Sequence, residues 1–216
     1  MKIQTVLFDM DGTVLNTVDD LCDSVNAILS LYGLPPISVR DTARYLGNGA
    51  RHLIECAVPA GTDPAVTEAV LADYVPYYKA HCRIKTAPYP GILPLMERLR
   101  TAGIRMAIVS NKPDAATREL SDLFFGDLVD VTIGETPEIR RKPAPDTVLA
   151  AMRRMDADPE TCVYIGDTEV DIETARNSGI GCISVDWGFR SDQQLLDAGA
   201  SAVVHSPEEL ERLLAV

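Results

Sequence analysis

The sequence predicts an α/β protein, a doubly wound parallel sheet of the Rossmann-like kind interrupted by an all-helical insertion. Three observations lead to this prediction. A short apolar run from Ile3 to Phe8 is typical of a strand buried on both faces of a sheet. Residues 16–85 then show helical periodicity and no convincing strand. From residue 86 onward, strand and helix patterns alternate, which indicates β-α units with right-handed crossovers.

The insertion is predicted to hold four helices, because each candidate carries the start or stop signals that helices use. Ser38 and Asp63 stand at N-cap positions, Pro64 at a first helical position, and Gly33 where a helix would end. The predicted helices cover residues 18–32, 38–46, a segment around 53–56, and 64–81.

The remainder of the chain is predicted to build the sheet and its covering helices. Predicted strands cover residues 104–109, 129–133, 162–165, 181–185 and 202–204, with helices between them and one at the end. We therefore expect an α/β catalytic core domain of residues 1–15 and 86–216 and a helical cap domain of residues 16–85. Loops near residues 14–17 and 86–90 would be the two hinges between them.

Composition and charge limit the classes of function. The chain has 46% hydrophobic and 24% charged residues, which is ordinary for a globular protein with a full core. Its formal net charge of −12 disfavours binding to nucleic acid or to an anionic membrane. We see no signal peptide and no membrane span, and the five scattered cysteines suit a reducing compartment, so we expect a cytoplasmic protein. Monomer and homodimer both stay open.

Polar residues follow several of the predicted strands, at the edge of a parallel sheet where ligands bind. Two carboxylates one residue apart follow the first strand, a Ser-Asn-Lys run follows the second, and Lys142 precedes Pro143 between the third strand and its helix. Two more carboxylates follow the fourth strand. These candidate residues are Asp9, Asp11, Ser110, Asn111, Lys112, Lys142, Asp167 and Asp171.

These side chains suit phosphoryl transfer through a covalent aspartyl-phosphate. A carboxylate that attacks an anionic phosphoryl group needs a divalent cation, and oxygen ligands favour Mg²⁺. Asp9, Asp167 and the main-chain carbonyl of Asp11 can supply such oxygens. Lys142 can neutralise charge on the phosphoryl oxygens, and Ser110 and the Asn111 amide can hydrogen-bond to the same oxygens.

The motifs Asp9-x-Asp11-Gly12-Thr13, Ser110-Asn111-Lys112, Lys142-Pro143 and Gly166-Asp167-Thr168-x-x-Asp171 resemble the four motifs of the haloacid dehalogenase superfamily. The helical insertion resembles the cap of its phosphoglycolate phosphatase-like members. The resemblance implies that Asp9 is the nucleophile and Asp11 the general acid and base. It also implies that Asp9, Asp11 and Asp167 bind Mg²⁺ with support from Asp171, and that Ser110 and Lys142 hold the phosphate.

Some residues keep two interpretations. Lys112 can serve the site or lie in solvent, and Asp171 can support the metal site or only favour the first turn of a helix. In the cap, we hypothesise that Arg51 binds the non-phosphate end of the substrate, against the alternative of a solvent-facing helix arginine.

The function predicted from the sequence is a Mg²⁺-dependent phosphatase of small phosphorylated metabolites, with 2-phosphoglycolate as the first candidate substrate. Two alternatives remain. One is a phosphomutase or a sugar or nucleotide monophosphatase of the same superfamily. The other is a non-catalytic phosphate-binding module, against which the intact acid-base residue Asp11 argues.

Overall fold

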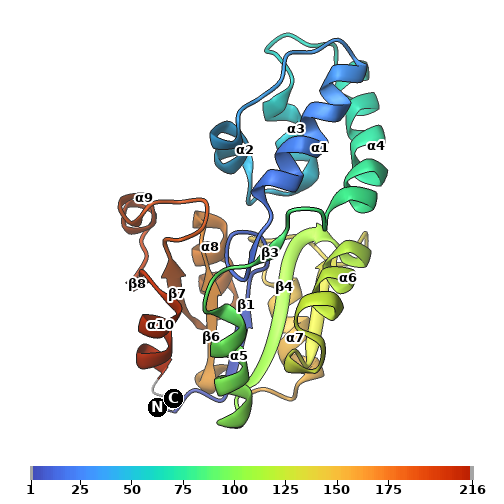
Figure 1. The fold of residues 1–216 in the computed structure, drawn as a ribbon. Helices are drawn as coiled ribbons and strands as arrows, with labels where there is room; N and C mark the ends of the chain where they lie inside the picture. Colours follow the sequence, from blue (N-terminus) through green and yellow to red (C-terminus); the bar gives the residue numbers. More distant parts are fainter. Residues whose placement is uncertain (1, 215–216) are drawn as a thin grey trace. The chain divides into compact units, whose positions relative to one another are not determined.

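The computed structural model describes residues 2–214, and its contacts divide the chain into two compact units (Figure 1). One unit comprises Met1–Leu15 with Pro88–Val216, and the other is Asn16–Ala87. The chain passes between them at β2 (Leu15–Asn16) and β3 (Ala87–Pro88), which pair as a two-stranded sheet. We predicted loops at these two places. The short strands differ from that prediction, because two residues carry no readable strand period in the sequence.

The first unit contains a six-stranded sheet in the order β5-β4-β1-β6-β7-β8, and every pairing is parallel. This order confirms the predicted fold class, a doubly wound sheet with its first strand in the middle. The strands are β1 (Thr5–Phe8), β4 (Arg105–Pro113), β5 (Val131–Glu135), β6 (Cys162–Gly166), β7 (Gly181–Val185) and β8 (Val203–Val204).

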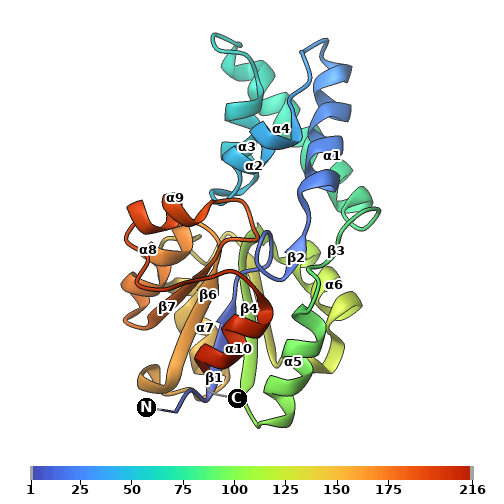
Figure 2. The same cartoon turned by 60° about the vertical axis from the view of Figure 1, so that its left-hand side comes forward.

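Helices cover the sheet on both faces (Figures 1 and 2). They are α5 (Ile92–Thr101), α6 (Asp114–Phe124), α7 (Asp146–Arg154), α8 (Glu169–Ser178), α9 (Asp192–Asp197) and α10 (Pro207–Leu214), with short 3₁₀ turns at Gly126–Leu128 and Pro159–Thr161. Both views show α5 beside α10, and α7 lies against α8.

The strand β4 is longer than predicted. We expected it to end at Val109, but it runs to Pro113 and therefore contains Ser110, Asn111 and Lys112. Its register with β5 shifts between Val109 and Pro113, as at a β-bulge. A bulge re-aims the side chains that follow it and is common near active sites. The apolar pattern of β4 ends at Val109, whereas its pairing with β5 continues to Pro113. The apolar pattern alone therefore could not predict the full length of the strand.

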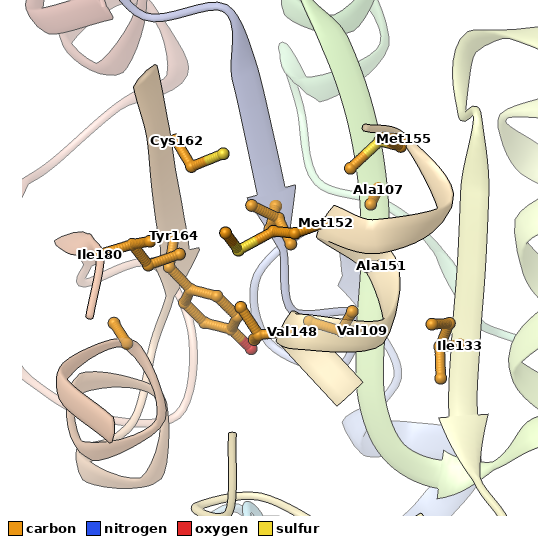
Figure 3. Packing of buried hydrophobic residues seen from close by; sticks show 12 residues of the cluster. Ala107, Val109, Ile133, Val148, Ala151, Met152, Met155, Cys162, Tyr164 and Ile180 are labelled. Atoms are coloured by element: carbon orange, nitrogen blue, oxygen red, sulfur yellow. The ribbon is translucent and has the colours of Figure 1, made fainter. Parts of the chain in front are cut away.

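The core between α7 and the sheet holds the centre of the unit together. Alternate strand residues such as Leu7, Ala107 and Val109 pack against Val148, Ala151 and Met152 of α7 (Figure 3). Most of these side chains are completely buried, so each large one contributes about 1.5–3 kcal/mol to folding. Tyr164 of β6 belongs to the same cluster and carries the one phenol in it. A buried phenol needs a polar partner, and that partner belongs to the site described below.

The second unit consists of four helices, α1 (Val18–Leu31), α2 (Val39–Tyr45), α3 (Gly49–Ala57) and α4 (Pro64–His81). The predicted caps form: the Ser38 hydroxyl accepts a hydrogen bond from the Asp41 N–H at 3.1 Å, and the Asp63 carboxylate accepts one from the Ala65 N–H at 2.8 Å. No helix within residues 2–214 is both long enough and apolar enough to cross a membrane.

A buried carboxylate in this unit connects the chain segments next to β2 and β3. Asp20, in the first turn of α1, accepts hydrogen bonds from the backbone N–H groups of Ile84, Lys85 and Thr86 at 2.9–3.0 Å. It also accepts one from the Thr86 hydroxyl at 2.8 Å. The segment that leads into β3 is therefore held directly against the helix that follows β2, and both segments are expected to move together.

We predict that Asp20→Ala lowers the free energy of unfolding by about 3 kcal/mol, because it leaves several buried donors without an acceptor. Asp19→Ala is the matched control, since Asp19 is the preceding residue and is exposed. It should cost less than about 1 kcal/mol. Urea denaturation of both variants measures the difference, and equal losses would mean that the Asp20 contacts do not stabilise this unit.

Candidate active site

The turn after β1 places two carboxylates at the carboxyl edge of the sheet. The Asp9 N–H continues the ladder by donating to the Ile165 carbonyl at 2.9 Å. The chain then folds around the Met10 carbonyl, which accepts from the N–H groups of Val14 and Leu15 at 3.1 and 3.0 Å. Gly12 has φ = 85°, a value that other residues rarely adopt. A side chain at Gly12 would also collide with the Asp167 carboxylate.

A buried ammonium lies between two of the predicted carboxylates. Lys142 Nζ is 2.8 Å from Asp9 Oδ1 and 2.8 Å from Asp171 Oδ1, and it donates to the Tyr164 hydroxyl at 3.0 Å. These three partners match the three N–H donors of an ammonium. The Lys142 side chain is only 2% exposed. Lys142 is therefore not a solvated surface lysine.

Asp171 starts a helix, as one of its two interpretations predicted, and it also contacts Lys142, while its support of a metal site stays a prediction. Its Oδ1 contacts Lys142 and accepts from the Tyr164 hydroxyl at 3.1 Å, while its Oδ2 accepts from the N–H and hydroxyl of Thr168 at 3.0 and 2.7 Å. The Thr168 contacts form a capping box at the start of α8. The same carboxylate thus begins the helix and holds the lysine.

Asp167 is held by neutral donors. Its Oδ1 accepts from the Thr13 hydroxyl at 2.8 Å and its Oδ2 from the Phe189 N–H at 2.8 Å. The residue is completely buried. Carboxylate oxygens of Asp9, Asp167 and Asp171 lie within 4.8 Å of one another. Three buried acids therefore meet here, and Lys142 contacts two of them, Asp9 and Asp171.

The pKa values of Asp9, Asp167 and Lys142 reflect the excess of negative charge among these buried groups. Burial, followed by the negative charge of Asp171, raises the pKa of Asp9 to about 7 despite the lowering effect of Lys142. Burial and the charges of Asp171 and Asp9 raise the pKa of Asp167 well above its ordinary value. Burial lowers the pKa of Lys142, but the Asp171 and Asp9 carboxylates outweigh it and leave that pKa raised. A further cation beside Asp9 and Asp167 would relieve this repulsion.

Lys112 belongs to the site. Its Nζ contacts both carboxylate oxygens of Asp11, at 2.8 and 3.0 Å, and its side chain is 2% exposed. The solvated interpretation of Lys112 is thus wrong as well. Its partner is the Asp11 carboxylate, so it serves a different acid from the one that Lys142 serves.

Asn111 makes contacts that the sequence did not predict. Its Oδ1 accepts from the backbone N–H of Lys142 at 2.7 Å and its Nδ2 donates to the Lys142 carbonyl at 3.0 Å. A pair of hydrogen bonds of this kind holds a backbone segment in one orientation, so Asn111 positions Lys142. Ser110 is buried beside it, and its Oγ accepts from the Lys112 N–H at 3.2 Å. Binding of phosphate oxygens by the Asn111 amide stays a prediction.

Arg51 lies in the other compact unit, at the start of α3. Its guanidinium pairs there with both carboxylate oxygens of Glu68, with Glu55 at 3.8 Å. The side chain is half exposed. Contact between Arg51 and a substrate stays a prediction.

Sequence reasoning missed Tyr164, and it noted Trp187-Gly188 only as part of the resemblance, without giving the loop at residues 186–190 a role in the site. Tyr164 interrupts an apolar strand three residues before Asp167, and a phenol inside such a strand signals a buried polar partner. The loop contributes the Phe189 N–H to Asp167, and the Trp187 indole donates to the Thr13 carbonyl at 3.0 Å. Backbone donors carry no signal in the sequence, so only the single tryptophan could have pointed to this loop.

Comparison with known proteins agrees with this geometry. A family model described as haloacid dehalogenase-like hydrolase matches residues 6–185. A phosphoglycolate phosphatase of Xanthomonas campestris is 34% identical, over 96% of this chain and 94% of its own. An N-acetylmuramic acid 6-phosphate phosphatase of Pseudomonas aeruginosa is 30% identical, over 97% of this chain and 94% of its own.

A solved structure from Lactobacillus delbrueckii subsp. bulgaricus superposes with a TM-score of 0.94. It is 37% identical and covers 99% of both chains, and its assignment as a phosphoglycolate phosphatase is itself a prediction. The family match covers most of the chain and includes Asp9, Asp11, Ser110, Lys142 and Asp167. Together with the three buried acids that meet at this edge of the sheet, it leads to one conclusion: the chain belongs to the haloacid dehalogenase-like hydrolase family.

Proposed function

We propose that this enzyme is a Mg²⁺-dependent phosphatase of small phosphate monoesters that works through an aspartyl-phosphate on Asp9, with 2-phosphoglycolate as the first candidate substrate. Membership of the family and the phosphatase names of its relatives make it a phosphoric monoester hydrolase. The nucleophile, the cation and the substrate are the parts that we propose here.

The arrangement of Asp9 is the observation that carries the proposal. Both of its side-chain hydrogen bonds, from Lys142 Nζ and the Met10 N–H, go to Oδ1. Within residues 2–214, Oδ2 accepts none, and the side chain keeps 7% of its surface exposed. A carboxylate with one oxygen anchored and one available is suited to nucleophilic attack. Lys142 lies close enough to stabilise the charge on a phosphoryl group that approaches Asp9.

The acidic residues fit a hard divalent cation. Asp9 and Asp167 would hold Mg²⁺ together with the Asp11 carbonyl, while both oxygens of Asp171 already accept hydrogen bonds. An all-oxygen ligand set and a local excess of negative charge are what Mg²⁺ prefers. When bound, the cation would offset the repulsion between the Asp9 carboxylate and an anionic phosphoryl group.

Asp11 is the proposed general acid and base. It is two residues beyond the nucleophile, and its carboxylate is held by Lys112 through both oxygens. In its protonated form Asp11 can give a proton to the leaving oxygen, and the carboxylate that results can then accept a proton from the attacking water. A receiver-like module that only stores phosphate needs no such group, so the pair of Asp9 and Asp11 favours turnover.

The relatives support two candidate substrates. The Xanthomonas relative supports 2-phosphoglycolate. The Pseudomonas relative supports a sugar phosphate, N-acetylmuramic acid 6-phosphate, at similar coverage of both chains. Selection between such monoesters depends on the residues around the non-phosphate end of the substrate, where we propose that Arg51 acts.

We predict that Asp9→Asn reduces kcat by about 10⁴-fold or more, because an amide cannot replace the attacking carboxylate. Asp19→Asn, the same change at an exposed site, should keep wild-type kcat. Thermal unfolding of both proteins would show that they are folded. Hydrolysis by Asp9→Asn above about a hundredth of the wild-type rate would remove Asp9 as the nucleophile.

The substrate is tested by phosphate release from 2-phosphoglycolate, N-acetylmuramic acid 6-phosphate, hexose phosphates and nucleoside monophosphates, each with Mg²⁺ and with chelator. We expect chelator-sensitive turnover with the highest kcat/KM for 2-phosphoglycolate. A preference for N-acetylmuramic acid 6-phosphate would keep the reaction and replace the substrate. No release from any compound would favour a phosphomutase or a non-catalytic module.

The raised pKa values predict how Mg²⁺ affects stability. The folded metal-free protein holds a proton on Asp9 more tightly than the unfolded chain does, so this group makes stability fall as the pH rises from about 4 to about 7. Asp167 acts in the same direction. A bound cation needs both carboxylates ionised and reverses the loss.

We therefore expect saturating Mg²⁺ to raise the melting temperature by about 5–10 °C at about pH 7.5 and by clearly less at about pH 5. Differential scanning fluorimetry against a chelator control measures both shifts. The Asp167→Asn variant should lose them, since it removes one proposed ligand. A Mg²⁺ effect that does not change with pH would contradict the proposed site.

A further inference from the structure

The loop that follows β7, residues 186–190, has no role in the proposed chemistry, but it contacts residues of the active site. We call it the post-β7 loop. β7 pairs with β6 in the sheet, so the loop begins at the same edge as Asp167. It contains Trp187, the one tryptophan of the chain, followed by Gly188, Phe189 and Arg190.

The loop controls the donors to both oxygens of Asp167. The Phe189 N–H reaches Oδ2 directly at 2.8 Å. Oδ1 is reached through an intermediate: the Trp187 indole donates to the Thr13 carbonyl at 3.0 Å, and the Thr13 hydroxyl donates to Oδ1 at 2.8 Å. Two hydrogen bonds at opposite oxygens fix the plane of a carboxylate. The orientation of Asp167 therefore depends on the loop.

Close packing at Gly188 and an ion pair at Arg190 hold the post-β7 loop against the segment that carries Asp167. A Cβ atom at Gly188 would collide with the Asp167 side chain and with the Gly12 carbonyl, so no larger residue allows the loop to lie this close. At the other end, Arg190 donates through Nε and a terminal nitrogen to the two carboxylate oxygens of Glu169, at 2.8 and 3.0 Å. Glu169 is the first residue of α8, two positions after Asp167.

Within residues 2–214, the Thr13 hydroxyl and the Phe189 N–H donate to Asp167, and both donors are neutral. A carboxylate has about four lone-pair positions, and these hydrogen bonds use two of them. The loop thus orients Asp167 without supplying a positive charge, and the remaining lone-pair positions stay available to a cation. Partners of metal ligands commonly change metal affinity by about 10- to 100-fold when they are removed.

We propose that the post-β7 loop is the positioning element that sets the divalent-cation affinity of this site, with Trp187 acting on Asp167 through Thr13. The inference rests on the proposed metal site. Trp187 and Thr13 are positioning residues, because neither is proposed to contact substrate or metal. The effect of Trp187 should appear in cation binding and in the Mg²⁺ dependence of turnover, and should be nearly absent from kcat at saturating Mg²⁺.

The test uses Trp187→Phe, which removes the indole N–H and keeps an aromatic ring. Mn²⁺ binding to the full chain, measured by electron paramagnetic resonance of the free ion, gives the dissociation constant without catalysis. We expect it to rise about 10-fold. The Mg²⁺ concentration for half-maximal phosphate release should rise by the same factor, with kcat at saturation within about 2-fold of wild type.

Ser121→Ala is the matched control. It removes a hydrogen bond of similar length, 2.8 Å between the hydroxyls of Ser121 and Thr132, from another part of the same unit. Its Mn²⁺ dissociation constant should equal that of wild type. In chelator, the melting temperatures of both variants should lie within about 5 °C of wild type, which separates the binding effect from general destabilisation.

A double-mutant cycle tests the route through Thr13. Thr13→Val removes the hydroxyl that reaches Asp167 and keeps the carbonyl that Trp187 contacts. If Trp187 acts through this hydroxyl, Thr13→Val should weaken Mn²⁺ binding, and adding Trp187→Phe should weaken it only slightly further. Fully multiplicative effects would overturn the route through Thr13. An unchanged Mn²⁺ dissociation constant in Trp187→Phe, or an equal change in Ser121→Ala, would overturn the whole inference.

Failure of the proposed function would look different. In that case the wild-type protein would release no phosphate from any monoester, whatever Trp187→Phe does to Mn²⁺ binding. If the wild-type protein releases phosphate with Mg²⁺ and Trp187→Phe shows the same Mn²⁺ and Mg²⁺ dependence, only the inference about the loop fails.

Discussion

The buried ion cluster around Lys142 is the interaction on which the rest of the site depends. One ammonium contacts Asp9 and Asp171 at 2.8 Å, and a carboxylate oxygen of a third acid, Asp167, lies within 4.8 Å of oxygens of both. Removing one partner from such a cluster strands a buried charge and costs about 3–5 kcal/mol. The fold makes the cluster possible, because β1 and β6 are parallel neighbours and their carboxyl ends deliver Asp9 and Asp167 to the same edge.

Most of the fold and the membership of the site could be predicted from the sequence, because both follow from short-range patterns. Apolar runs predicted the main strands, capping residues predicted the helix starts, and the position of a residue just after a strand predicted its place in the site. The partners could not be predicted in this way. The contact of Asn111 with the Lys142 backbone joins residues 31 positions apart, and Asn111 lies in the part of β4 where the register with β5 shifts.

Asp171 shows how one carboxylate can serve both the fold and the site. A carboxylate has two oxygens, and each of them has a separate role here, because one holds the ammonium of Lys142 while the other caps α8. The helix start therefore fixes the acid, and the acid fixes the lysine. Tyr164 strengthens the same arrangement from β6, because its hydroxyl accepts from Lys142 and donates to Asp171. Burial also raises its pKa well above the ordinary value, so it stays a neutral donor.

The site holds its acids mainly with neutral donors, and this arrangement links stability to function. Thr13, Phe189 and Tyr164 orient carboxylates without adding positive charge, so the cluster keeps more negative charge than Lys142 balances. Additional cations would make the metal-free protein more stable, but they would also remove the attraction for a divalent ion. Natural proteins commonly accept such local instability at functional sites and compensate for it elsewhere. Here the compensation is the apolar core between α7 and the sheet, which begins beside Tyr164 and keeps the charged residues in place.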